Sequence, residues 1–475
     1  MLFNSLHFAV FFPIVTLAFF LLEGRRRWWM LLVASAYFYM ALVPAYILIL
    51  AGVILVDFAA GLLIARSEGS ARRFWLCASL VGNFGVLFSF KYWGFVAEQV
   101  GWLASWTGSS WQPPLLGWLL PVGLSFHTFQ SVAYTIEVYW RRQPPERNLA
   151  VYALYVLFYP QLVAGPIERP GRLLSQIHGS TATRFDAERA SSGLRLMLWG
   201  LVKKVVVADG LAAIVDRAYS NLSQADSVVL LIAAYAFSIQ IYCDFSGYTD
   251  IARGAARVMG FDLMLNFDRP YESTSMGEFW RRWHISLSSW FKDYLYVPLG
   301  GSRRGSLLTT RNVLVVFLVS GLWHGASWNF VVWGAIHGVL VTMEGRLGFG
   351  RTERRRSRLE LALRWLFVFH AVTLAWIFFR APTMGVAVDY YARLFAGDGF
   401  DTLRGHNVGA PLDVAWAFGA GLAVLVLEWA HARHDLAARF IGWPRSARWA
   451  LYYAGVLALW VGSAASPQQF IYFQF

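Results

Sequence analysis

A histidine within an apolar run is the residue of this chain best suited to chemistry. His324 lies in Trp323-His324-Gly325 and is the only ionisable residue between positions 313 and 333. Ionisable side chains are costly at membrane depth, so they usually face a cavity or partner and mark functional sites. Burial favours a neutral imidazole, which can accept a proton from a hydroxyl group. The pattern predicts that His324 is a general base. The alternative is a structural histidine that donates to a backbone carbonyl.

Two further histidines lie in aromatic or apolar segments. In a continuous helix, His284 would share one face with Trp280, Trp283 and Leu287. Such a helix would lie at the cytosolic leaflet of a membrane. His284 could orient an acyl donor or a second histidine, or it could be an interfacial residue. His337 follows Gly334 in a different predicted helix, and we expect it to serve in packing.

The segment 240–251 carries a polar stripe. In a helix, one face would hold Gln240, Asp244, Gly247, Tyr248 and Ile251. Asp244 lies near a predicted membrane boundary and needs a partner, which we expect to be an arginine or a histidine. A structural ion pair that locks two helices is favoured over a direct chemical role.

A basic cluster surrounds His284 in the sequence. It comprises Arg269, Arg281, Arg282, Lys292, Arg303, Arg304 and Arg311. These residues could attract a polyphosphorylated donor, or they could bind anionic lipid headgroups. The sequence contains neither a Walker-type nor a Rossmann-type phosphate loop, and no GxSxG elbow. Its two cysteines have no disulfide or metal-ligand spacing, so no metal site is predicted.

The composition is that of a polytopic membrane protein. Hydrophobic residues make up 57% of the 475 positions and charged residues 15%, whereas soluble domains carry about 25% charged residues. The net charge of +13 resides in short loops, where basic residues set topology, so no nucleic acid partner is predicted. Predicted spans lie at 6–22, 28–43, 46–65, 74–94, 115–139, 193–217, 227–250, 311–325, 328–345, 361–379, 411–430 and 448–465.

Loop charges predict the orientation of these spans. The loops at 25–27, 66–73, 141–147, 269–311, 346–358 and 431–448 are basic, which places them in the cytosol and both termini outside. The first span is expected to be retained, because the N-terminus lacks the features of a cleaved signal peptide. The apolar segment 149–165 breaks the alternation. We expect it to be a re-entrant or partly buried helix, with an additional span as the alternative.

Five sequence blocks carry a resemblance to a known family. They are Leu120-Pro121-Val122-Gly123-Leu124-Ser125-Phe126, Tyr159-Pro160-Gln161-Leu162-Val163-Ala164-Gly165-Pro166-Ile167, Asp244-Phe245-Ser246-Gly247-Tyr248, Phe279-Trp280-Arg281-Arg282-Trp283-His284-Ile285-Ser286-Leu287-Ser288 and Gly321-Leu322-Trp323-His324-Gly325. With them the chain resembles the membrane-bound O-acyltransferase (MBOAT) family, specifically its bacterial branch that acts on extracellular polymers. The similarity spans essentially the whole chain.

The resemblance implies a fold and a set of site residues. The fold would be an all-α ring of about 12 tilted transmembrane helices, with re-entrant and amphipathic elements around a central funnel. A single domain would cover residues 1–475, with a C-terminal tail at 466–475. His324 matches the catalytic histidine of the family and His284 its supporting histidine. The expected supporting or donor-binding residues are Asp244, Tyr248, Arg281, Arg282, Trp283, Trp323 and Arg304.

The resemblance also implies a reaction and its location. Acetyl-CoA would be the cytosolic donor substrate, with no bound cofactor. The acetyl group would pass across the bacterial inner membrane towards hydroxyls of an extracytoplasmic polysaccharide, through a periplasmic esterase-like partner protein. The polymer remains open among alginate, peptidoglycan and other exopolymers. A proton-coupled transporter or flippase that uses His324, His284 and Asp244 as a relay is the alternative, and an assembly platform with structural histidines is a third reading.

The aromatic C-terminal segment 470–475 contains a candidate acyl carrier. It resembles the tail found in this branch and in a small D-alanylation partner protein, where a tyrosine is the proposed carrier. Tyr472 is the matching residue here. Composition alone favours an aromatic anchor at the membrane interface, because tyrosine and phenylalanine are common there. Both interpretations stay open.

Overall fold

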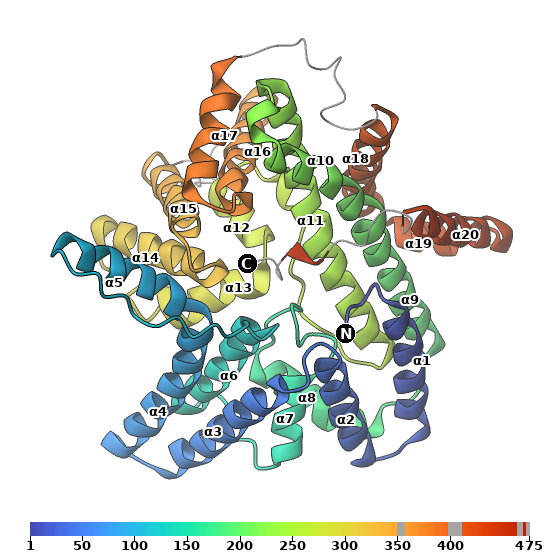
Figure 1. Cartoon of the computed structure of the whole chain (residues 1–475). Helices are drawn as coiled ribbons and strands as arrows, with labels where there is room; N and C mark the ends of the chain where they lie inside the picture. Colours follow the sequence, from blue (N-terminus) through green and yellow to red (C-terminus); the bar gives the residue numbers. More distant parts are fainter. Residues whose placement is uncertain (349–356, 398–410, 463–468, 472–475) are drawn as a thin grey trace. The chain divides into compact units, whose positions relative to one another are not determined.

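The computed structural model of this chain describes residues 1–348, 357–397, 411–462 and 469–471 (Figure 1). Within these ranges the regular structure is helical and no β-strand occurs. The all-α prediction is confirmed. This outcome suits a chain so rich in apolar residues, because a helix satisfies its own backbone hydrogen bonds in lipid. The number of about 12 spans and their arrangement in a ring stay predictions.

The chain divides into two compact units. The first comprises Met1–Met197 with Ile251–Met264, and the second comprises Leu198–Asp250 with Leu265–Phe475. The helices α9 (Ala187–Leu201) and α11 (Ser227–Val258) each contribute residues to both units. The single-domain assignment for residues 1–475 stays a prediction. Most of the candidate site residues belong to the second unit.

The first unit packs short and medium-length helices. Its elements other than part of α9 and α11 are α1 (Leu6–Leu21), α2 (Arg26–Met40), α3 (Tyr46–Arg66), α4 (Gly69–Leu87), the π-helix η1 (Phe88–Tyr92), α5 (Trp93–Trp106), α6 (Leu124–Tyr139), α7 (Leu149–Leu157), α8 (Pro170–Gly179) and the 3-10 helix η2 (Ser180–Ala182). Figure 1 shows α3 and α4 side by side. A buried carboxylate links them, because the Asp57 Oδ1 atom accepts hydrogen bonds from Ser79 at 2.6 Å and Asn83 at 2.8 Å.

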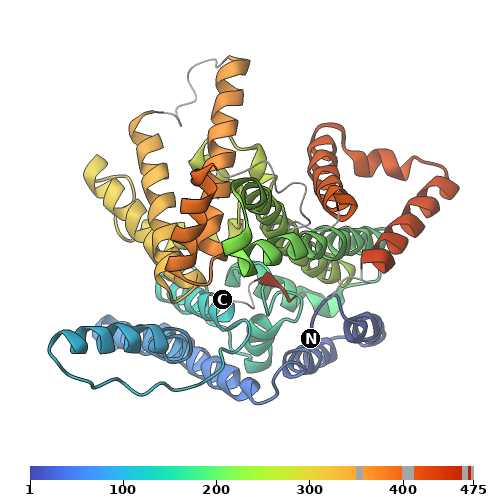
Figure 2. The same ribbon diagram turned by 45° about the horizontal axis from the view of Figure 1, so that its top comes forward.

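The second unit contains the helices that carry the site. Besides its parts of α9 and α11, they are the π-helix η3 (Val202–Ala208), α10 (Asp209–Ser220), η4 (Leu222–Gln224), η5 (Pro270–Glu272), α12 (Met276–Arg282), α13 (Ile285–Phe291), the π-helix η6 (Lys292–Tyr296), α14 (Ser306–His324), α15 (Trp328–Arg346), α16 (Arg358–Arg380), α17 (Met384–Ala396), α18 (Pro411–His434), α19 (Leu436–Ile441) and α20 (Arg445–Gly462). Figure 2 shows α18, α19 and α20, in red, as a bent hairpin. Both α18 and α20 pack against η3.

Six helices of the described residues are long and apolar enough to cross a membrane. They are Tyr46–Arg66, Gly69–Trp106, Ser227–Val258, Ser306–His324, Arg358–Arg380 and Leu412–His434. Each overlaps one of the spans predicted from the sequence. Other predicted spans form shorter helices, such as α1 with 16 residues and α2 with 15. A helix of about 20 residues matches the hydrocarbon core of a bilayer, so these shorter helices fall below that length.

The start of one predicted span is wrong. The span was predicted at 115–139, but its helix α6 starts nine residues later, at Leu124, and residues 110–121 form no helix. Pro113, Pro114 and Pro121 explain this, since proline lacks the N–H that a helix interior needs. The stretch between the predicted spans 74–94 and 115–139 is largely helical, because α5 extends to Trp106.

The apolar segment 149–165 forms a short buried helix. The helix α7 has nine residues, and all of them from Ala150 to Leu157 are buried. At about 1.5 Å per residue, a helix of this length cannot cross a bilayer. The prediction of a partly buried helix is therefore confirmed, and the alternative of an additional transmembrane span is wrong. The helix ends just before Pro160, where the following backbone is also buried.

Candidate active site

His324 is placed by a tight pair of helices, α14 and α15. It is the last residue of α14, its side chain is buried, and α15 begins four residues later. Small residues let the two backbones touch. A Cβ atom on Gly321 would lie 2.1 Å from the carbonyl oxygen of Phe330, and one on Gly334 would lie 2.3 Å from that of Phe317. This close backbone approach at Gly321 fixes the end of α14 that carries His324.

Replacement of Gly321 by alanine should destabilise this helix pair. The new methyl group would overlap the Phe330 carbonyl, so a backbone must move, which costs about 1–3 kcal/mol. We expect a lower melting temperature for purified Gly321→Ala protein in detergent. Gly345→Ala is the matched control on α15, because a Cβ atom there would meet nothing within 4 Å. Equal melting temperatures for the two variants would contradict the close-contact interpretation.

His284 lies at a break between two short helices. The continuous helix expected across 280–287 is wrong, since α12 ends at Arg282 and α13 begins at Ile285. His284 has φ 44° and ψ 55°, in the left-handed region that few residues other than glycine adopt. Buried Asn266 supports the break, because its backbone oxygen accepts from the Ile285 N–H at 2.9 Å and its side-chain oxygen from the Ser286 N–H at 3.2 Å. Asn266 thus binds N–H groups that a helix start leaves without partners.

The two histidines meet in an aromatic site. The ring centroids of His284 and His324 are 6.5 Å apart, and the Trp323 ring lies 6.1 Å and 4.9 Å from them, respectively. The rings of Trp333 and Phe379 lie 5.1 Å and 5.3 Å from that of His324. Both imidazoles are buried, and burial lowers the pKa of His284 to about 3. A neutral imidazole in water-poor surroundings can accept a proton.

His337 belongs to the packing around this site. It is fully buried in α15, and the Trp280 Nε1–H donates to its Nδ1 atom at 3.3 Å. Its ring lies 4.9 Å from that of Trp333. These contacts agree with the packing role predicted for His337.

Asp244 is paired with a lysine. One carboxylate oxygen lies 2.8 Å from the Lys204 ammonium, and the other accepts the Ile471 backbone N–H at 2.7 Å. Lys204 also lies 2.8 Å from an Asp209 oxygen. The expected arginine or histidine partner is therefore wrong in residue type. Tyr248, one turn further along α11, stacks on Phe470 with ring centroids 4.7 Å apart.

A second ion-paired lysine, the buried Lys203, lies next to Lys204 in the chain and was not singled out in the sequence analysis. Lys203 lies 2.6 Å from Asp250 and 3.2 Å from Glu428, and Glu428 accepts a 2.5 Å hydrogen bond from the Tyr242 hydroxyl. A signal was present, because the adjacent lysines at 203 and 204 lie within a predicted apolar span. By the argument applied to His324, such residues mark a site or a buried partner.

The remaining site residues fall into two environments. Trp283 and Trp323 are almost fully buried, and the Trp283 ring stacks on Phe279 at 5.5 Å. By contrast, Arg281 and Arg304 are exposed, and half-buried Arg282 lies 2.8 Å from Glu278. Tyr472 lies outside the described residues. Among the described side chains, no group of three or more histidine, cysteine, aspartate or glutamate residues could hold a metal ion.

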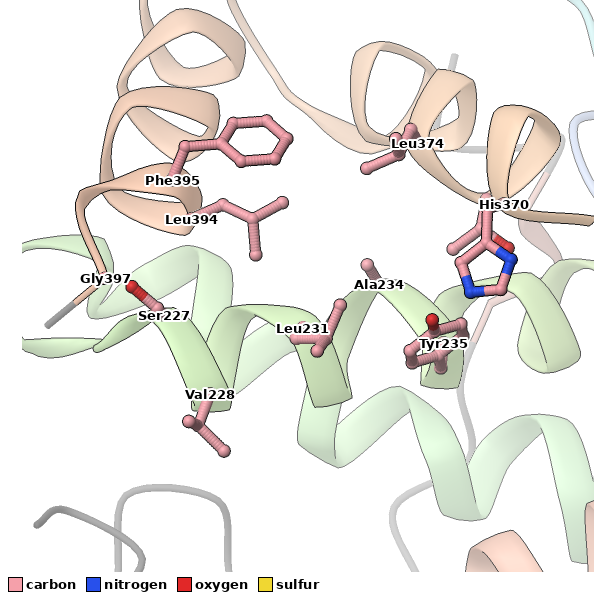
Figure 3. Close-up of a pocket in the computed structure, with 11 residues that line it drawn as sticks. Ser227, Val228, Leu231, Ala234, Tyr235, His370, Leu374, Leu394, Phe395 and Gly397 are labelled. Atoms are coloured by element: carbon pink, nitrogen blue, oxygen red, sulfur yellow. The ribbon is translucent and has the colours of Figure 1, made fainter. Parts of the chain in front are cut away.

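Two apolar cavities of the second unit lie apart from the histidine pair. One of about 380 Å³ lies among α11, α16 and α17, and Figure 3 shows His370 next to Tyr235 at one end, with Leu394 and Phe395 at the other. The other, of about 520 Å³, lies among α12, α15 and α16. Neither His284 nor His324 lines these cavities. Their mainly apolar linings suit hydrocarbon chains better than acid–base chemistry.

Comparison with known proteins decides the family. Residues 141–381 match the model of MBOAT, the membrane-bound O-acyltransferase family. The chain belongs to the membrane-bound O-acyltransferase family. It is accordingly a multi-pass membrane protein and an O-acyltransferase. The matched residues of this acyltransferase include His284 and His324.

The similarity to bacterial relatives extends over most of the length of this O-acyltransferase. The probable alginate O-acetylase AlgI of Pseudomonas putida is 37% identical over 83% of this chain and 80% of the relative. The Pseudomonas aeruginosa protein of the same name is 38% identical over 83% and 75%. The peptidoglycan O-acetyltransferase of Helicobacter pylori is 32% identical over 82% and 78%.

Proposed function

We propose that this enzyme moves an acetyl group from cytosolic acetyl-CoA towards hydroxyl groups of an extracytoplasmic polysaccharide, with a periplasmic protein as partner. The buried histidines His284 and His324 carry the proposal, because their rings are only 6.5 Å apart in an aromatic, water-poor site. Relatives named for the O-acetylation of alginate and peptidoglycan support the acetyl group and the polymer class. The proposed location is the bacterial inner membrane, with both termini in the periplasm.

The proposed chemistry begins at the thioester. An attacking hydroxyl loses its proton to His324 as its oxygen bonds to the acetyl carbon. The carbon–sulfur bond then breaks, and His324 passes the proton to the departing thiolate, so that free CoA is released. In this scheme His284, whose low pKa keeps it neutral, positions the reactants beside His324. The buried aromatic rings around both histidines exclude water, which would otherwise hydrolyse the thioester.

Tyr472 is the proposed first acceptor. Its phenol oxygen would take the acetyl group from CoA as an ester and then release it to the hydroxyl of the partner or polymer, which regenerates the phenol. Such a covalent relay divides one difficult transfer into two easier steps. Residue 471, which precedes Tyr472 in the sequence, is hydrogen-bonded to Asp244 in the same unit as both histidines. This attachment of the tail supports the carrier role.

The exposed residues Arg281 and Arg304 are proposed to bind the donor, acetyl-CoA. Charge reversal by Arg281→Glu with Arg304→Glu should raise the KM for acetyl-CoA about tenfold or more, since each cation can make a charge-assisted contact with CoA phosphates. The KM for the acceptor should change little. The measurement is CoA release by purified protein at varied acetyl-CoA concentration. Arg433→Glu, a half-exposed arginine on α18, is the matched charge control. An unchanged KM for acetyl-CoA would leave these arginines as topology determinants.

The decisive experiment for the proposed function is reconstitution. Purified protein in vesicles is supplied with acetyl-CoA carrying a labelled acetyl group, a polysaccharide such as alginate, and the periplasmic partner. Labelled polymer with one CoA released per acetyl group is the expected result. A requirement for an ion gradient without any acetyl transfer would instead support the relay-based transporter.

A further inference from the structure

The segment 469–471 is inserted into the protein rather than lying on its surface. Phe470 is 3% exposed and Ile471 2% exposed. The Phe470 ring stacks on Tyr248 at 4.7 Å and meets Phe245 at 5.8 Å. The Phe245 ring in turn contacts that of His284 at 4.7 Å. A continuous line of aromatic contacts therefore joins the C-terminal segment to the supporting histidine.

Phe245 and Tyr248 form the aromatic part of the site that holds segment 469–471, and Asp244 forms its polar part. It is buried on α11, with Phe245 and Tyr248 at the following position and one turn later. Its carboxylate is divided between two donors, with the Lys204 ammonium on Oδ1 and the Ile471 backbone N–H on Oδ2. Hydrogen bonds to an ionised acceptor are about twice as strong as neutral ones. A buried carboxylate aimed at a backbone N–H is thus a strong and sequence-independent hold on the segment.

Lys204 keeps that carboxylate in place. A buried charge without a partner is costly, and the ammonium of Lys204 offsets this cost for both Asp244 and Asp209. Lys204 lies on the π-helix η3, whose wider turn departs from the regular α-helical spacing. Such π-bulges inside helices often occur at functional sites. A Cβ atom on Gly247 would lie only 2.7 Å from the Gly200 carbonyl, so α11 and the residues that lead into η3 are in close contact.

We propose that Asp244 is a positioning residue that docks the C-terminal segment 469–471 beside His284, with Lys204 holding Asp244 ready for that segment. In this proposal the Asp244–Lys204 ion pair not only joins two helices but also binds segment 469–471. The docking does not depend on the proposed function. Its consequence for catalysis, the retention of the carrier tail near the histidines, does rest on that function.

Trimming by a carboxypeptidase tests the docking directly. Full-length protein with a native C-terminus and an N-terminal tag is digested in detergent, and intact mass spectrometry follows the loss of each residue. In wild-type protein, release of Ile471 and Phe470 should be slow. In Asp244→Ala it should be about tenfold faster or more, the change expected when one charge-assisted hydrogen bond is lost. Equal release rates in both proteins would overturn the proposal.

A charge swap separates docking from a structural ion pair. Asp244→Lys combined with Lys204→Asp restores an attraction between η3 and α11, but an ammonium cannot accept the Ile471 N–H. Docking by Asp244 predicts fast trimming of the swapped protein even where its melting temperature recovers. Slow trimming in the swapped protein would show that the ion pair alone holds the segment, and the proposal would fail.

Two further variants cover the case of an unfolded Asp244→Ala protein. Phe470→Ala changes only the docked segment and should also accelerate the loss of residues 471 and 470. An unchanged rate would contradict the proposal that the contacts of the Phe470 ring help to hold the segment. Glu428→Ala removes a carboxylate that pairs with the neighbouring Lys203, and should leave trimming slow. Fast trimming in Glu428→Ala would overturn the assignment to Asp244. These measurements need no donor or acceptor, so an absence of acetyl transfer would refute the proposed function and leave the docking intact.

Discussion

The His324→Ala variant is expected to lose about 10²–10⁴-fold in acetyl transfer rate, the usual contribution of a general base. The ring of His324 lies at the end of α14 among Trp323, Trp333 and Phe379. Alanine removes the proton acceptor but keeps the helix and its glycine contacts. The measurement is the initial rate of CoA release and of polymer acetylation, normalised to folded protein in the membrane.

His337→Asn is the matched control for this variant. His337 is a buried histidine of the same aromatic cluster, and its Nδ1 atom accepts from Trp280. The asparagine side-chain oxygen can take over that acceptor position, so we expect a change in stability and little change in rate per folded molecule. Near-normal acetylation by a well-expressed His324→Ala protein would exclude the base role. Equal rate losses in both variants would indicate damage to packing instead.

Tyr472→Phe is expected to abolish polymer acetylation, because phenylalanine keeps the aromatic ring and removes only the hydroxyl that would carry the acetyl group. A relay that loses its covalent acceptor cannot complete the first step. An aromatic anchor, by contrast, would tolerate the change. The assay is polymer acetylation in cells and in vesicles. Mass spectrometry of the C-terminal peptide of wild-type protein should also detect the mass added by an acetyl ester.

Tyr453→Phe controls for the loss of a tyrosine hydroxyl elsewhere. Tyr453 lies on α20 with 67% of its surface exposed, so removal of its hydroxyl should have no effect on transfer. Retained acetylation in Tyr472→Phe would refute the carrier role and support the anchor. The Phe470 ring and the Ile471 N–H are unchanged in this variant, so docking of segment 469–471 should persist.

Gly321 and His324 of α14 show how much can be predicted from the local sequence. An isolated ionisable residue in an apolar run is itself a signal, because the cost of burial applies wherever the segment folds. Gly321 likewise signals close backbone contact, and the structure places it against Phe330. The length of the apolar runs in the sequence predicted the helices that are long enough to cross a membrane. It failed at the start of 115–139, where Pro121, preceded by Pro113 and Pro114, lacks the backbone N–H that a helix interior needs.

Local sequence was enough to predict the all-helical membrane class, the two candidate histidines and the aromatic residues next to them. The contacts between these parts follow from packing of segments that are distant in the chain. Asp244 pairs with Lys204, 40 positions away by residue number, and with the Ile471 N–H, 227 positions away. The break at His284 likewise depends on hydrogen bonds that the Ile285 and Ser286 N–H groups donate to Asn266, which lies outside both short helices. Periodicity and propensity report on neighbours within a few turns, whereas the partner of a buried charge is chosen by the packing of distant segments.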